Sequence, residues 1–169
     1  MHGMPSGVDE GRLVAALVFL ASIFGLATAF LGEHVFGLEP CILCLYERVP
    51  YAVAAVLAAG AAFLPIGNGW RATMMGLAAL VFAIGAGLAF YHVGVEEHWW
   101  ASIAACGGEL PAGAEAEDLR NLSASDLKPC DRVDWRLFGV SLAGYNVLVS
   151  FVLAGISIAG ARILGTKAR

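Results

Sequence analysis

The chain has 169 residues, of which 59% are hydrophobic and only 14% are charged, and its mean hydropathy is +0.76. These values exclude an ordinary soluble globular protein and indicate a chain that is surrounded by lipid. The net charge of -4 says nothing about nucleic acid, but no run rich in Lys and Arg suggests a nucleic-acid-binding protein, so that class is set aside.

Four uncharged stretches predict membrane-spanning helices, at about 13–31, 49–64, 72–91 and 137–161. Each approaches the roughly 20 residues that a helix needs to cross about 30 Å of hydrocarbon. The alternating pattern of a barrel strand is missing, and lipid does not satisfy an open backbone, so helices are required. Arg12 precedes the first stretch, as a basic residue does in a secretory signal. The length of this stretch and the lack of a small-residue cleavage pattern after it favour a retained helix.

We therefore expect an all-α membrane protein, a single domain over 1–169 that forms a four-transmembrane-helix bundle. Positive charges fall on one side of the membrane if the four spans alternate, and short cytoplasmic segments are enriched in such charges. The residues concerned are Arg12, Arg71, Arg162, Lys167 and Arg169. Both termini are thus predicted to be cytoplasmic, with a loop at about 32–48 and a long loop at about 92–136 outside.

All four cysteines lie on the predicted outer side. Cys41 and Cys44 belong to the first loop, and Cys106 and Cys130 to the second. Disulfides persist in oxidising compartments, whereas cysteines used only for packing would be scattered through the spans. The placement favours redox chemistry.

The Cys41-x-x-Cys44 motif lies where the first loop turns into a helix. Unpaired N–H groups at a helix N-terminus stabilise a thiolate, which is the reactive form of cysteine. Arg48 follows Cys44 by four residues, so on a helix the two share a face and the guanidinium adds to that stabilisation. An arginine at the membrane boundary is otherwise an interfacial anchor.

Zinc is the competing chemistry for a Cys-x-x-Cys motif. A structural zinc site needs a second close ligand pair, and a long acidic segment separates Cys106 from Cys130. His34 and His92 would be able to complete a site in principle. We predict no metal.

The second cysteine pair has two interpretations. A Cys106–Cys130 disulfide is a structural staple in the usual case, but the segment between them has few large apolar groups and resembles a mobile carrier.

Asn146 in the fourth span is predicted to face the bundle and bond another helix, and we expect no ionisable residue inside a span. Small residues at four-residue spacing predict the close helix contacts of the third span, namely Ala79, Ala83 and Gly87.

The chain resembles the disulfide bond formation protein B (DsbB) family in four separated motifs that cover nearly its whole length in order. They are Glu39-Pro40-Cys41-x-x-Cys44-x-Tyr46-x-Arg48, Tyr91-His92-Val93-Gly94-Val95-Glu96 with Trp99-Trp100, Pro129-Cys130-Asp131, and Leu137 to Asn146.

This resemblance implies a protein-dithiol:quinone oxidoreductase of the bacterial inner membrane that reoxidises a periplasmic thioredoxin-fold oxidase of the DsbA type. It implies that Cys41 and Cys44 face the quinone, which is either ubiquinone or menaquinone. It also implies that Cys106 and Cys130 meet the partner and that Arg48 contacts the quinone. His92 matches a position beside the quinone, although a histidine there is also a common interfacial residue.

Other functions stay open at this point. A vitamin K epoxide reductase type of protein has the same ingredients, but its loop pair precedes the Cys-x-x-Cys motif. A thiol reductant carrier would run electrons in the opposite direction. A membrane scaffold with structural disulfides and a transporter are the alternatives without redox activity.

Overall fold

The computed structural model of the chain describes residues 9–100, 129–133 and 135–168. Cys106 and most of the long loop lie outside these residues. The described part contains four helices that are long and apolar enough to cross a membrane. They are α1 (Glu10–His34), α2 (Ile42–Phe63), α3 (Asn68–Glu96) and α5 (Leu142–Thr166). The prediction of an all-α bundle of a multi-pass membrane protein is confirmed.

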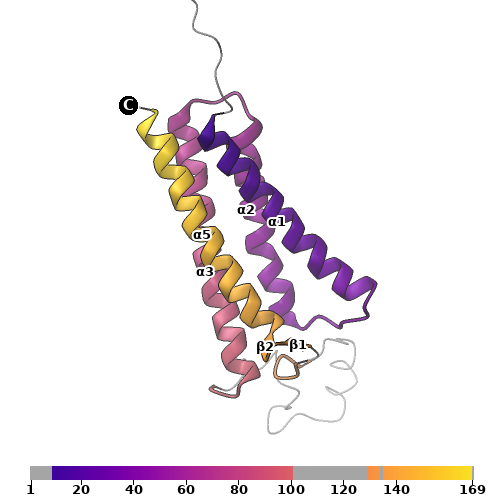
Figure 1. Cartoon of the computed structure of the whole chain (residues 1–169). Coiled ribbons are helices and arrows are strands. Elements are labelled where there is room, and N and C mark those ends of the chain that lie inside the picture. The colour runs from indigo at the N-terminus through magenta and orange to yellow at the C-terminus, as the bar shows by residue number, and fades with distance from the viewer. Residues whose placement is uncertain (1–8, 101–128, 134, 169) are drawn as a thin grey trace, which may run out of the picture.

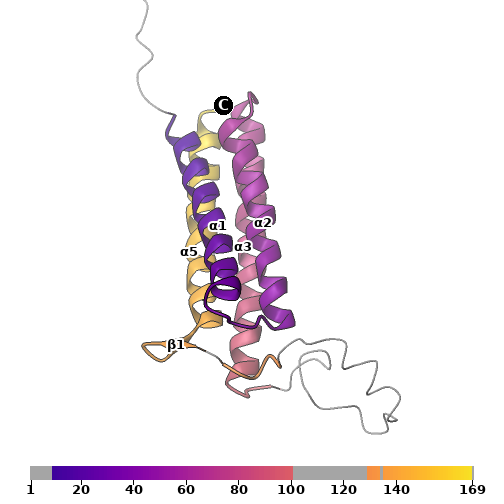
Figure 2. The same ribbon diagram turned by 90° about the vertical axis from the view of Figure 1, so that its right-hand side faces the viewer.

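The first residues of α1 and the last residues of α5 lie at the same end of the bundle (Figures 1 and 2). The opposite end carries the α1–α2 connection and a small antiparallel hairpin of β1 (Arg136–Leu137) and β2 (Val140–Ser141). Phe138 and Gly139 form its two-residue turn with φ of 51° and 82°, the left-handed values that such tight hairpin turns require. This hairpin end holds the candidate site.

The helix bounds differ from those predicted at several ends, and three of these lie beside the candidate site. Helix α2 begins at Ile42 instead of about 49, α3 runs on to Glu96 instead of about 91, and α5 begins at Leu142 instead of about 137, after the hairpin. The prediction took uncharged stretches as the spans, which left Glu47 and Arg48 outside the second span and His92 and Glu96 outside the third. The structure shows that charged and titratable side chains continue inside the helices because they are buried against one another there.

The expectation that no ionisable residue lies inside a span is therefore wrong. Glu47, Arg71, His92 and Glu96 all lie within helices and are each at most 9% exposed. Such groups are rare in membrane helices unless they pair with one another or with backbone groups. Arg71 illustrates the second case, because its Nη2 donates to the carbonyl of Leu64 at 2.9 Å.

Side chains cap three of the four helices at their N-termini. Asp9 accepts from the N–H of Gly11, the sulfur of Cys41 accepts from the N–H of Cys44, and Ser141 accepts from the N–H of Gly144. Each bond satisfies a backbone donor that the first helical turn leaves free. The cap on α2 is unusual because a cysteine provides it, and this fixes Cys41 at the start of the helix.

The helices pack in the order α1, α2, α3, α5, with α3 and α5 in the most extensive contact and α1 and α5 in the least. Contacts between α1 and α5 occur near the termini, where Gly11 lies against Leu164 and Gly160 against Val14. Towards the hairpin end α1 leans away from α5 (Figure 1). The site thus lies among α2, α3 and α5.

The predicted small-residue contacts of α3 are only partly right. Ala79 is buried, but Ala83 and Gly87 are exposed on the outer surface of the bundle. The close approach occurs at Gly85, where an added Cβ would lie 2.9 Å from Cβ of Pro50 on α2. The packing face of α3 is turned away from the stripe that spacing suggested.

Replacing Gly85 with alanine is expected to lower the free energy of unfolding by about 1–3 kcal/mol, because the new methyl group forces α2 and α3 apart. Gly87→Ala on the same helix is the matched control, since its Cβ would meet nothing within 4 Å. We expect that control to change stability by less than about 1 kcal/mol. Reversible unfolding of both variants in mixed micelles measures the difference, and equal effects would contradict the packing.

Candidate thiol site at the hairpin end

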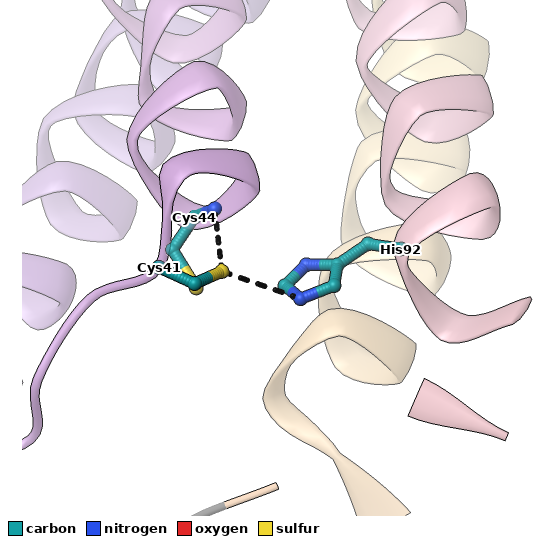
Figure 3. A group of neighbouring side chains, drawn as sticks. All are labelled: Cys41, Cys44 and His92. Atoms are coloured by element: carbon teal, nitrogen blue, oxygen red, sulfur yellow. Dashed lines mark hydrogen bonds between the residues drawn. The ribbon is translucent and has the colours of Figure 1, made fainter. Parts of the chain in front are cut away.

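Cys41 and Cys44 occupy the first turn of α2, with their Sγ atoms 2.8 Å apart. Cys41 is 3% exposed and Cys44 is half-buried. Both sulfurs point towards α3, where the ring of His92 faces them (Figure 3). The predicted reactive pair is thus held at a helix N-terminus, and it is enclosed by the bundle.

Cys130 is brought to the same place by the segment that precedes the hairpin. It is 1% exposed and packs in one cluster with Cys41, Leu43 and Val95. Contact with Cys130 is the largest cause that raises the pKa of the Cys41 thiol, followed by contact with Cys44 and by burial. The Cys41 thiol therefore needs a proton acceptor before it reacts as a thiolate.

His92 lies between the thiols and two carboxylates. Its Nδ1–H donates to Oε1 of Glu47 at 2.6 Å, and its Nε2 lies 3.5 Å from Sγ of Cys41 and 3.8 Å from Oε1 of Glu96. The Glu47 bond sets the tautomer and aims Nε2 at the cysteines. In this position the imidazole is able to take up a proton that a thiol releases.

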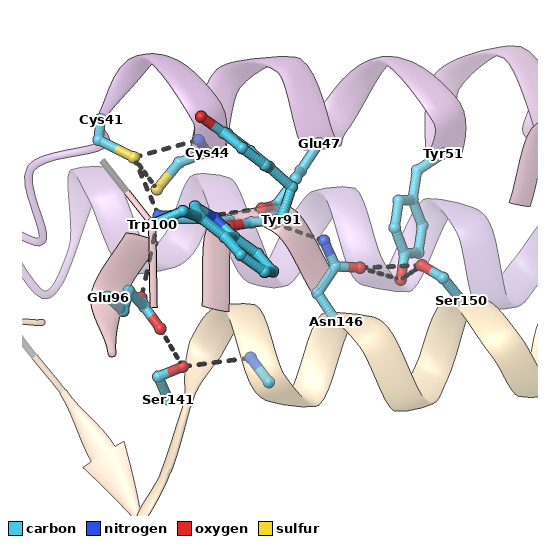
Figure 4. A network of polar contacts seen from close by, with 12 residues as sticks. Cys41, Cys44, Glu47, Tyr51, Tyr91, Glu96, Trp100, Ser141, Asn146 and Ser150 are labelled. Atoms are coloured by element: carbon cyan, nitrogen blue, oxygen red, sulfur yellow. Dashed lines mark hydrogen bonds and ion pairs between the residues drawn. The ribbon is translucent and has the colours of Figure 1, made fainter. Parts of the chain in front are cut away.

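The Glu47 carboxylate, which accepts from His92, continues into a polar network with Asn146, Tyr51 and Ser150 (Figure 4). Nδ2 of Asn146 donates to Oε2 of Glu47 at 2.6 Å, and Oδ1 of Asn146 accepts from the hydroxyl of Tyr51 at 2.8 Å and from that of Ser150 at 3.0 Å. The prediction that Asn146 bonds another helix is confirmed. At the opposite side of His92, Ser141 donates to Glu96, so the start of α5 is tied to the end of α3.

Arg48 makes different contacts from those that its spacing predicts. Its Nη1 lies 2.7 Å from Oε2 of Glu33 on α1, and its guanidinium lies over the ring of Phe30 at 4.9 Å. Among the described residues, the cationic or proton-accepting group next to the cysteines is His92. Arg48 instead joins α1 to α2 at the hairpin end.

An apolar hollow of about 220 Å³ lies further along α2, against α3. Val49, Pro50 and Val53 line it from α2, and Val81 and Ile84 line it from α3. It begins one residue after Arg48 and opens to the outer surface of the bundle.

Sequence reasoning missed Glu47 and treated Glu96 only as part of a motif. The signal for Glu96 is its position four residues after His92, which places the two on one helix face. Glu47 has no comparable signal, because its partners His92 and Asn146 come from two other helices and only the fold brings them together.

The family model described as "Disulfide bond formation protein DsbB" matches residues 11–160. Relatives named "Disulfide bond formation protein B" include one from Acinetobacter baumannii, 31% identical over 84% of this chain and 85% of its own length. Another, from Marinobacter nauticus, is 35% identical over 81% of this chain and 83% of its own length.

No solved structure gives a significant match. The family match nevertheless extends over most of the chain, and the paired thiols lie within the matched region. The chain belongs to the DsbB family of disulfide bond formation proteins.

Proposed function

We propose that the chain reoxidises a DsbA-type thiol oxidase in the periplasm and passes the electrons through two cysteine pairs to a membrane quinone. The observation that carries this proposal is the packing of Cys130 against Cys41, beside Cys44. A residue of the second pair thus touches a residue of the first, as a relay between pairs needs. In this account the bundle lies in the bacterial inner membrane with the hairpin end on the periplasmic side.

The relay proceeds by successive thiol–disulfide exchanges. A thiolate of the partner attacks Cys106 of the Cys106–Cys130 disulfide and releases the Cys130 thiolate. Cys130 attacks Sγ of Cys41 in the Cys41–Cys44 disulfide and releases the Cys44 thiolate. The partner's second thiolate then closes the partner's own disulfide and frees Cys106, which displaces Cys41 from Cys130. Two electrons now reside on Cys41 and Cys44.

Proton transfer accompanies this chemistry, because a thiol must lose its proton before it attacks and a released thiolate takes one up. Cys41 must lose its proton before it rejoins Cys44 in a disulfide. His92 Nε2 lies 3.5 Å from that sulfur, and Glu47 stabilises the imidazolium that forms. We assign to His92 the role of proton acceptor for Cys41.

The residues present fit a quinone. Arg48, by its place in the family motif, and His92, beside the cysteines, are the groups that would hold its polar ring, and the apolar hollow that begins one residue after Arg48 would take a hydrocarbon tail. When bound, a quinone accepts two electrons and two protons. Arg48 would stabilise negative charge that develops on the bound ring, and the Cys44 thiolate would supply the electrons. Ubiquinone and menaquinone both meet these requirements.

A Cys106→Ser protein is expected to form no mixed disulfide with the DsbA-type partner, because the sulfur that the partner attacks is gone. Cys44→Ser is the comparison, since it retains the Cys106–Cys130 disulfide that the partner attacks and lacks the Cys41–Cys44 disulfide that receives the electrons next. Non-reducing electrophoresis of alkylated mixtures separates the two outcomes. If Cys106→Ser oxidised the partner at the wild-type rate, the relay through Cys106 would be wrong.

Replacing Arg48 with methionine is expected to raise the KM for a soluble quinone analogue roughly 10-fold, the equivalent of losing a hydrogen bond to a charged group. Glu33→Gln is the matched control, because it breaks the same ion pair but keeps the guanidinium. An unchanged KM in Arg48→Met, or an equal rise in both variants, would assign Arg48 to helix packing alone.

A further inference from the structure

The thiol site has the composition of a soft-metal site. One ligand atom each from Cys41, Cys44 and His92 lies within 4.8 Å of the other two. Two of these residues come from α2 and one from α3 (Figure 3), and Cys41 and His92 are both 3% exposed. Thiolate and imidazole are the ligands that zinc prefers. The sequence argued against zinc because it has no second ligand pair close by, and the fold supplies the missing histidine.

The surroundings of His92 match those of a metal-bound histidine. A ligating histidine commonly donates its other ring N–H to a carboxylate, which fixes its orientation and raises its basicity. Glu47 accepts from Nδ1 of His92 at 2.6 Å, so that Nε2 is left facing the cysteines. Glu96 lies 3.8 Å from Nε2 and adds a second negative charge beside a dication.

The separations are close to those of a tetrahedral site. Bonds of about 2.3 Å to sulfur and about 2.0 Å to nitrogen place these two ligand atoms about 3.5 Å apart, and Sγ of Cys41 lies 3.5 Å from Nε2 of His92. The two sulfurs, now 2.8 Å apart, must open to about 3.8 Å.

We propose that the reduced form of this site binds one zinc ion through Cys41, Cys44 and His92. Binding displaces the two thiol protons and occupies the sulfur lone pairs, whereas a Cys41–Cys44 disulfide has no thiolate to offer. Zinc therefore distinguishes the reduced chain from the oxidised one. The binding of zinc does not depend on the proposed function. Its consequence does rest on that function: zinc bound to Cys41 and Cys44 prevents their thiol–disulfide exchange and so stops turnover.

Cobalt(II) is the probe for the test, because its visible spectrum reports both tetrahedral geometry and thiolate ligation. The full chain in detergent is reduced, freed of reductant under anaerobic conditions and titrated with cobalt. We expect tetrahedral d–d and thiolate charge-transfer bands that saturate at one equivalent and disappear when zinc is added. Bands are expected to be missing from the oxidised chain. A reduced wild-type chain without these bands would overturn the proposal.

Two histidine variants locate the ligand. His92→Ala is expected to weaken cobalt binding at least 10-fold, whereas His34→Ala, on α1 with its ring bonded to the carbonyl of Phe30, leaves it unchanged. Equal affinities would exclude His92 as a ligand. If His92→Ala does not fold, the comparison of reduced and oxidised wild-type chains decides. Because these readouts do not use quinone, a chain that binds cobalt but fails to reduce quinone would refute the proposed function alone.

Discussion

Replacing Cys44 with serine is expected to slow quinone reduction by roughly 10³-fold or more, because the electron-donating thiolate is removed and a serine hydroxyl forms no disulfide. The half-buried Cys44 lies beside Cys41, whose pKa is raised by its neighbours and by burial, so Cys44 is the sulfur suited to react as a thiolate. The decrease in quinone absorbance during oxidation of a reduced DsbA-type partner measures the rate.

The same variant gives an internal control. Cys44→Ser keeps Cys41, Cys106 and Cys130, so we expect it to retain a mixed disulfide with the partner while quinone reduction fails. Its unfolding in detergent should match that of the wild type, because serine is nearly isosteric with cysteine. A quinone-reduction rate within a few fold of the wild type would remove Cys44 from the pathway.

Replacing Glu47 with alanine is expected to lower the free energy of unfolding by about 3 kcal/mol. Glu47 is 8% exposed and bonds both His92 and Asn146 at 2.6 Å, so its loss leaves two buried polar groups without this partner. Breaking a buried charged pair from one side is strongly destabilising. Unfolding in mixed micelles at fixed detergent composition provides the measurement.

Tyr51→Phe is the matched control for Glu47→Ala. It removes only a hydroxyl from the same network and keeps the ring that packs edge-on against Phe82. Neutral hydrogen bonds between membrane helices contribute about 0.6 kcal/mol on average, so a small effect is expected. If the two variants lost equal stability, Glu47 would not be the centre of the network.

Hydropathy predicts the bundle well because each span must satisfy its own backbone in lipid. The rule that gave the spans also misplaced their ends. It began the second span at about Val49 and ended the third at about Tyr91. In the structure Glu47 and His92 lie inside α2 and α3 and bond one another at 2.6 Å. A single sequence does not show that two charged positions will meet, so charge was taken as the end of a helix.

Some features of the cysteine site follow from the sequence, and others depend on the fold. The Cys41-x-x-Cys44 spacing predicts the pair itself, because both residues fall within one helical turn. The contacts of Cys130 with Cys41 and of Arg48 with Glu33 depend on how separate segments pack, and local spacing does not encode that packing. Gly85 was missed for the same reason, since its partner Pro50 lies on another helix.

The most direct test of the relay is the stoichiometry of electron transfer in a mixture of the purified chain, a reduced DsbA-type partner and a quinone analogue. The number of partner disulfides formed, counted by thiol alkylation and mass spectrometry, is compared with the amount of quinone reduced. We predict one disulfide for each quinol, with catalytic amounts of the chain. Partner oxidation without quinol formation, or quinol-driven reduction of the partner's disulfide, would contradict the relay.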